Sequence, residues 1–94
     1  MLILITYDVN TTDAKGRSRL RKIAKECVNY GQRVQNSVFE CSLDTTQYRQ
    51  VQHRLCSIMD KDKDSIRFYF LGKRPKIEHF GVKESYDPDS FIMI

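Results

Sequence analysis

The sequence lacks the marks of a membrane protein, a secreted protein or a zinc protein. No apolar run approaches the ~18 residues of a membrane span. The apolar stretch at the start is too short for a signal peptide and has no positive region before it, so we expect a cytoplasmic protein. The three cysteines, which cannot all pair within one chain, show no C-x-x-C spacing and no neighbouring histidine. We interpret Cys27, Cys41 and Cys56 as small core residues.

Linkers, internal repeats and low-complexity tracts are absent as well, so we expect residues 1–94 to form a single domain. A domain of this size buries roughly 60–70% of the surface of its unfolded chain, which leaves little room for an internal cleft. A composite site between subunits is consistent with this limit.

The sequence does have a carboxylate at the end of an uncharged strand. Residues 2–6 are apolar or β-branched and predict a buried strand, and Asp8 lies at its carboxyl end. The segment that follows is strongly basic. A carboxylate in a positive field suits a site that binds a divalent metal and handles phosphate. The alternative is that Asp8 only ends the strand and begins a turn.

Positive charge is unevenly distributed along the chain, whose formal net charge is +4. Six cations follow one another without an intervening acid: Lys15, Arg17, Arg19, Arg21, Lys22 and Lys25. A second group comprises Lys73, Arg74 and Lys76. Such asymmetry favours a polyanionic partner. The alternative is a solvated helix face, but a surface helix usually carries compensating acids, and none is interleaved here.

Apolar spacing predicts two amphipathic helices. In the first, capped by Thr12 or Asp13 and stopped by Gly31, one face holds Leu20, Ile23, Ala24, Cys27 and Val28. In the second, capped by Asp44 or Thr45, the stripe is Tyr48, Val51, Leu55, Ile58 and Met59. Gly16 either marks where the regular helix begins or lets the backbone approach a phosphate, and we favour the first reading.

The remaining segments predict strands. The apolar parity changes within residues 32–43, which predicts two short strands or one bent strand with its hinge at residues 36 and 37. Residues 60–64 form a turn of alternating charge. The strand after it places Ile66, Phe68 and Phe70 on one face and Arg67 and Tyr69 on the other.

The order strand, helix, two strands, helix, strand predicts an α+β, ferredoxin-like (βαββαβ) fold, with both helices on one face of an antiparallel sheet. The chain ends in four apolar residues, 91–94. We expect them to form a C-terminal strand that pairs across a homodimer, and the alternative is packing within the chain.

Several segments together resemble one known family. These are residues 2–9, the Arg-Ser-Arg-Leu-Arg run at 17–21, residues 31–40 with Gln-Asn-Ser-Val-Phe-Glu, residues 65–69 and residues 81–83. The combination is similar to the small CRISPR-associated Cas2 proteins, and looks closest to the forms that accompany type I-C systems.

The resemblance implies a homodimer that takes part in CRISPR spacer acquisition for antiviral defence and bridges dimers of the CRISPR integrase Cas1. It also implies a Mg²⁺- (or Mn²⁺-) dependent endonuclease that cleaves RNA or double-stranded DNA. The alternative function is a non-catalytic scaffold that holds nucleic acid between integrase dimers.

By position, the resemblance makes Asp8 the catalytic and metal-binding residue. It makes Tyr7, Ser37 and Phe39 motif residues, and it assigns nucleic-acid contact to Arg17, Arg19 and Arg33. The basic segment adds Arg21 and Lys22 to these contacts. One carboxylate per chain is few for Mg²⁺, which takes about six oxygens, but a symmetric dimer supplies Asp8 twice.

Overall fold

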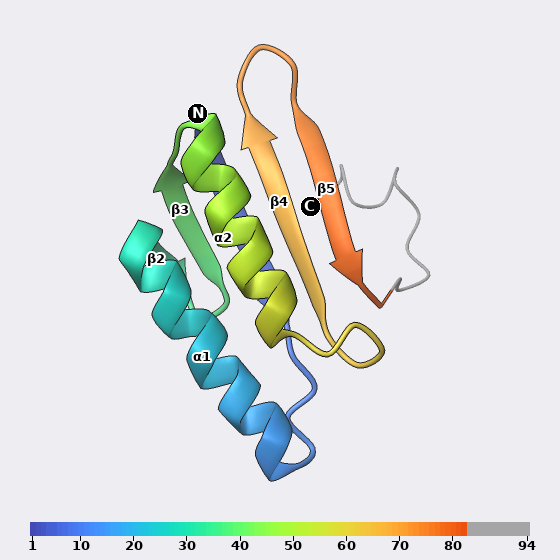
Figure 1. Cartoon of the computed structure of the whole chain (residues 1–94). Coiled ribbons are helices and arrows are strands. Elements are labelled where there is room, and N and C mark those ends of the chain that lie inside the picture. The colour runs from blue at the N-terminus through green and yellow to red at the C-terminus, as the bar shows by residue number, and fades with distance from the viewer. Residues whose placement is uncertain (83–94) are drawn as a thin grey trace.

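The computed structural model describes residues 1–82 (Figure 1). It confirms the predicted α+β, ferredoxin-like order and adds one strand. The elements are β1 (Leu2–Asp8), α1 (Ala14–Tyr30), β2 (Gly31–Gln35), β3 (Val38–Ser42), α2 (Thr45–Ile58), β4 (Ser65–Leu71) and β5 (Lys76–Gly81). The predicted pairing of residues 91–94 across a dimer lies outside the described residues.

The sheet is antiparallel throughout, in the order β2-β3-β1-β4-β5, so β1 lies in the centre. Figure 1 shows α1 and α2 on the same side of this sheet, so within residues 1–82 the other face has no helix on it. The added strand, β5, pairs with β4 of the same chain from Ser65↔Gly81 to Phe70↔Lys76. Among the described residues, the sheet therefore has one face covered by helices and one face without a helix, called the uncovered face below.

The core lies between the helices and the covered face. Strand alternation sends Ile3, Ile5 and Tyr7 of β1 into it, and the predicted inward residues of β4 join them. The prediction for Val28 is wrong, because its side chain is 59% exposed. At ~100° per residue, Val28 lies about 120° around the helix from the midpoint of Ile23 and Cys27, beyond the buried face.

The hinge predicted at residues 36 and 37 is confirmed, because β2 ends at Gln35 and β3 begins at Val38. A register shift between Arg33 and Gln35 accompanies it. The parity change therefore reflects two strands with a bulge, as a period-2 pattern requires.

Gly16 lies inside the first turn of α1, since the helix begins at Ala14 with Asp13 as its N-cap, and so it does not mark where the helix begins. A Cβ atom at Gly16 would lie 1.9 Å from the carbonyl oxygen of Asn10. The glycine thus allows the preceding loop to pack against the helix, and the close approach is to protein backbone.

No helix within residues 1–82 is both long enough and apolar enough to cross a membrane.

Candidate metal and nucleic-acid site

Asp8 lies at the end of the central strand, on the uncovered face of the sheet. Since successive strand residues alternate, Ile5 and Tyr7 face the helices whereas Thr6 and Asp8 face away. Asp8 is exposed and pairs with Ser65, the first residue of β4. The carboxylate is therefore accessible and lies at the end of the central strand, where it pairs with β4.

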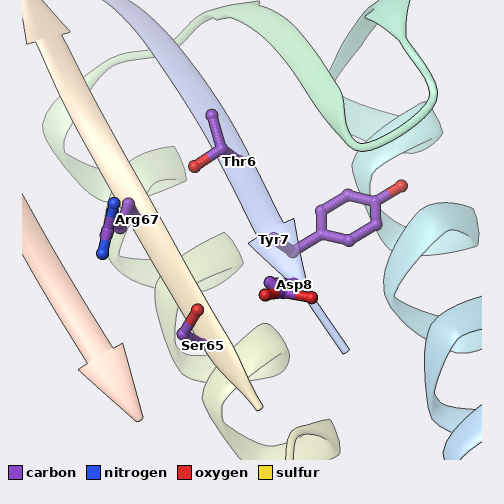
Figure 2. Close-up of a pocket in the computed structure, with 5 residues that line it drawn as sticks. All are labelled: Thr6, Tyr7, Asp8, Ser65 and Arg67. Carbon is purple, nitrogen blue, oxygen red and sulfur yellow. The ribbon is translucent and has the colours of Figure 1, made fainter. Parts of the chain in front are cut away.

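A small pocket of about 100 Å³ surrounds this carboxylate (Figure 2). Its lining residues are Thr6, Tyr7, Asp8, Ser65 and Arg67. Asp8 is the only acid among them. Within residues 1–82, no group of three or more histidine, cysteine or acidic side chains could hold a metal ion. One chain thus offers a single carboxylate, which fits a hard divalent cation only when further oxygens come from a second chain, water or substrate.

Tyr7 directs its ring away from the pocket, toward α1, as Figure 2 shows. Its hydroxyl donates a hydrogen bond to the carbonyl oxygen of Asn36 at 3.2 Å, and its backbone N–H donates to that of Ser37 at 3.1 Å. Burial raises the pKa of Tyr7 above 10.0, and a hydrogen bond with Arg33 partly offsets this rise. Tyr7 therefore ties the β2–β3 turn to the end of β1 and so helps to fix Asp8 in place.

Phe39 and Arg33 belong to the same group on the covered face. The Phe39 ring is buried and stacks on Tyr7 with a centroid distance of 6.2 Å. The guanidinium carbon of Arg33 lies 5.1 Å from the centroid of Phe39, which is a cation–π distance. The structure thus separates the predicted motif residues: Asp8 is on one face, whereas Tyr7, Phe39 and Arg33 are on the other.

The exposed cations of α1 lie along its solvent side. Arg17 and Arg21 are four residues apart, so they share one face of the helix, and Lys22 follows next to them. A guanidinium nitrogen of Arg17 donates to the carbonyl oxygen of Thr11 at 3.5 Å. These three side chains can reach a phosphate backbone.

Arg19 has a different environment. Its Nε atom donates to Oδ2 of Asp64 at 2.7 Å, and one Nη atom lies 3.4 Å from Oδ1 of the same carboxylate. Its side chain is 15% exposed. The guanidinium thus has a protein partner, and the geometry supports a role for Arg19 in holding α1 to the β4 end of the sheet.

Asp64 is the residue that the sequence analysis missed. Its side chain is fully buried and also accepts hydrogen bonds from the backbone N–H groups of Asn10 at 3.0 Å and Asp60 at 2.9 Å. Burial alone would raise the pKa of Asp64, but the hydrogen bonds from Arg19, Asp60 and Asn10 outweigh it and lower the pKa below 3.8. Because Arg19 and Asp64 are 45 residues apart, no local signal in the charged turn could identify the pair.

The second basic group lies far from Asp8. Lys73, Arg74 and Lys76 are exposed near the β4–β5 turn, whereas Asp8 pairs with the opposite end of β4. Six residue steps along a strand span roughly 20 Å, so this group and the Asp8 pocket are separate surfaces.

The family model described as "CRISPR associated protein Cas2" matches residues 1–76. The chain belongs to the Cas2 family.

Curated relatives match almost the whole chain. It is 54% identical over 96 residues to a protein of Nitratidesulfovibrio vulgaris named CRISPR-associated endoribonuclease Cas2, covering 100% of this chain and 94% of that protein. It is 56% identical over 89 residues to a protein of Halalkalibacterium halodurans named CRISPR-associated endonuclease Cas2, covering 93% of each.

Solved structures agree with the Cas2 fold. The crystal structure of Streptococcus pyogenes Cas2 at pH 6.5 superposes with a TM-score of 0.72 and 59% identity, covering 79% of this chain and 89% of that chain. A hypothetical protein from Thermus thermophilus superposes with a TM-score of 0.64 and 32% identity, covering 80% of this chain and 96% of that chain.

The Cas2 family match contains Asp8, the predicted motif residues and all predicted cations of α1 and β2, and it ends at the first residue of β5. The rest of β5 therefore forms part of the sheet beside the Asp8 pocket without being part of the matched segment.

Proposed function

We propose that two copies of this chain form a metal-dependent endonuclease of CRISPR spacer acquisition, with Asp8 of both subunits as the metal-binding and catalytic residues. The observation that carries this proposal is the exposed Asp8 carboxylate on the uncovered face of the sheet. The names of the curated relatives, endoribonuclease and endonuclease, support the reaction class.

The uncovered face also supports a homodimer. Apolar side chains lie exposed on this face: Leu2 is 41% exposed, Leu71 is 42% exposed and Ile77 is 45% exposed. Exposed apolar side chains gathered on one face are typical of an interaction surface. A two-fold axis through this face would bring the two Asp8 carboxylates toward each other and double the oxygens available to a cation.

The metal that this site suits is Mg²⁺ or Mn²⁺, because the donors are carboxylate and water oxygens. When bound, such an ion neutralises phosphate charge and lowers the pKa of a water molecule. The chain would hold the ion through Asp8. It keeps Asp8 in place through Tyr7 and Phe39 on the other face of β1 and β3, and through the backbone carbonyl of Ser37 in the β2–β3 turn.

The substrate is RNA or double-stranded DNA, contacted through its backbone. Arg17, Arg21 and Lys22 on α1 and Arg33 on β2 would bind phosphates, and Arg19 would orient the helix that carries three of them. Phosphate contacts position a nucleic acid without reading its sequence, so cleavage should show little sequence preference. The type I-C association and the bridging of integrase (Cas1) dimers are part of the same proposal.

A second candidate is a non-catalytic scaffold that holds nucleic acid between integrase dimers. The observation that favours it is the single carboxylate in each pocket, together with a basic helix that binds phosphate equally well without chemistry. The two candidates share every contact except the one between Asp8 and a metal.

The experiment that separates them is cleavage of a labelled RNA and a labelled DNA duplex by the purified wild type, Asp8→Asn and Asp62→Asn. Asn keeps the shape of Asp8 but loses the charge that attracts a hard cation. Asp62, an exposed acid of the α2–β4 loop, is the matched control.

We expect Asp8→Asn to lose cleavage while light scattering still shows a dimer and nucleic-acid affinity is nearly unchanged, and we expect Asp62→Asn to behave as the wild type. EDTA should abolish the wild-type reaction. Cleavage that persists in Asp8→Asn or in EDTA would contradict the metal site and leave the scaffold. A monomer at micromolar concentration would remove the composite site.

A further inference from the structure

Two side chains that the sequence analysis did not assign lie on the same face as Asp8. In the register of the sheet, Thr6 pairs with Arg67 and Arg67 pairs with His79. In the adjacent row, Asp8 pairs with Ser65. Since alternate residues of a strand share a face, Arg67 of β4 and His79 of β5 stand on the uncovered face beside the Asp8 row.

The spacing leaves room for a ligand between these groups. Arg67 is one strand and two residues from Asp8, which places their Cα atoms roughly 8 Å apart, and the corresponding distance for His79 is roughly 12 Å. On β4 and β5, the residues in register with Asp8 are Ser65, which has a small side chain, and Gly81, which has none. The pocket of about 100 Å³ includes Asp8, Ser65 and Arg67 in its lining. At ~30 Å³ per water, it holds about three waters or one group of similar size.

His79 has a polar atom that the described part of the chain does not satisfy. Its Nε2 atom is buried, and no hydrogen-bond partner for it exists within the described structure. Roughly nine in ten or more of buried polar atoms in proteins have a partner, so a buried ring nitrogen without one calls for a ligand or a water. By contrast, the other histidine, His53, lies exposed on α2.

We propose that Arg67, which lines the Asp8 pocket, and His79, which pairs with Arg67 on β5 beside that pocket, together bind a substrate phosphate next to a metal ion held by Asp8. The guanidinium donates to non-bridging oxygens of one phosphodiester, and His79 Nε2–H donates to the same group. The cations of α1 hold the flanking backbone, whereas this pair fixes the phosphate next to the metal. The inference rests on the proposed function and names two substrate-binding residues for it.

A direct test observes the two histidines by NMR. The chain has only two, so their ring Cε1–H signals can be assigned with one His53→Gln variant. Titration with a thymidine dinucleotide, which carries one phosphodiester, in metal-free buffer and at fixed protein concentration should shift the His79 signal in a saturable way and leave the His53 signal in place. Thymidine without the phosphodiester should shift neither.

A second test uses kinetics. Losing one charge-assisted hydrogen bond costs roughly tenfold in affinity, so Arg67→Gln and His79→Gln should each raise KM for RNA about tenfold, with a smaller change in kcat. Arg67→Lys, which retains the charge, should recover part of the loss. The matched controls are Arg74→Gln and His53→Gln, whose parent side chains are exposed elsewhere. Circular dichroism and light scattering check fold and dimer.

The inference is overturned if the His79 signal does not respond to the dinucleotide, or if folded Arg67→Gln and His79→Gln keep the wild-type KM. Its failure is distinguishable from failure of the proposed function. Loss of cleavage in Asp8→Asn with a silent His79 rejects the phosphate pair alone. Cleavage that survives Asp8→Asn while His79 responds rejects the metal chemistry and retains a phosphate site.

Discussion

Asp64→Asn should strongly destabilise this protein, because Asp64 joins three segments through one buried carboxylate. The carboxylate receives four donors: the Nε and Nη2 atoms of Arg19 and the backbone N–H groups of Asn10 and Asp60. An amide replaces one acceptor oxygen with an NH₂ group, which would face two of these donors. It also leaves the Arg19 charge without its acid.

Breaking one side of a buried ion pair costs about 3–5 kcal/mol, and the 15% exposure of Arg19 places this case near 3 kcal/mol. A domain of this length is stable by roughly 5–14 kcal/mol, so the loss is a large share of it. With a urea m-value of about 1.5 kcal/mol/M, the midpoint of unfolding should fall by about 2 M.

The assay is urea unfolding followed by circular dichroism for the wild type, Asp64→Asn, Arg19→Gln and the double variant. If the pair acts as described, the double variant should lose clearly less than the sum of the single losses. Asp62→Asn, in the same loop but exposed, should change stability by less than about 0.5 kcal/mol. A loss below about 1 kcal/mol for Asp64→Asn, or additive losses, would refute the reasoning.

The pH dependence gives an independent check of the sign. The folded-state pKa of Asp64 lies below the ordinary value of 3.8, so its contribution is fully present above that value. It is lost as the pH falls through the folded-state pKa. The stability difference between wild type and Asp64→Asn should therefore be constant near neutrality and shrink below about pH 3.8. A difference that grew on acidification would show that the carboxylate is not charged in the folded protein.

Three further predictions follow from the other contacts. Gly16→Ala should lower the free energy of unfolding in urea by about 1–3 kcal/mol, because its Cβ would lie 1.9 Å from the Asn10 carbonyl oxygen. Gly72→Ala, whose Cβ would have no atom within 4 Å, should cost far less, and equal losses would contradict the packing argument. A triple variant with Gln in place of the exposed cations Arg17, Arg21 and Lys22 should bind every duplex sequence more weakly. Fluorescence anisotropy should show the slope of log K against log salt reduced by about 3, because three charges are lost. An unchanged slope would make α1 a solvated face. Burial raises the pKa of Cys27 to about 12 and of Cys41 to about 11. At pH 8 a thiol reagent should therefore modify at most Cys56 in the folded protein, and all three thiols in urea. Rapid reaction of all three before unfolding would contradict their burial.

The sequence predicted the elements whose signals are local. The uncharged apolar run of β1, the alternation in β4 and the parity change at residues 36 and 37 reflect neighbouring residues. The cap of α2, predicted as Asp44 or Thr45, is also a local signal, and the structure shows Asp44 with the full capping box. These patterns repeat within one or two turns or steps of the chain, so no tertiary knowledge is needed to interpret them.

β5 escaped prediction because its inward face contains an acid. Glu78 points to the helix side, where it accepts a hydrogen bond from the Tyr48 hydroxyl at 2.5 Å and pairs with Lys76 at 2.9 Å. With an acid at an inward position, the sequence of β5 does not show apolar alternation. Tyr48, the partner that accommodates this acid, is 30 residues away.

The candidate site could be predicted only in part for the same reason. Asp8 was predicted as a site residue from its place at a strand end, and the structure confirms that place, which needs no partner to predict. The environment of Arg19 depends on Asp64, and the position of His79 depends on the register between β4 and β5. Sheet register and long-range ion pairs are properties of the assembled fold. The sequence of a basic helix therefore cannot show which of its cations pair with an acid of the same protein and which are exposed to a ligand.

The uncovered sheet face also has a consequence for how the amount of active protein would depend on expression. If the working site needs Asp8 from two copies, then at concentrations well below the dimer dissociation constant the number of sites grows with the square of the chain concentration. Doubling synthesis would quadruple activity in that range and only double it once dimers saturate. A nuclease without sequence preference would thus stay nearly silent at basal expression and become active steeply on induction.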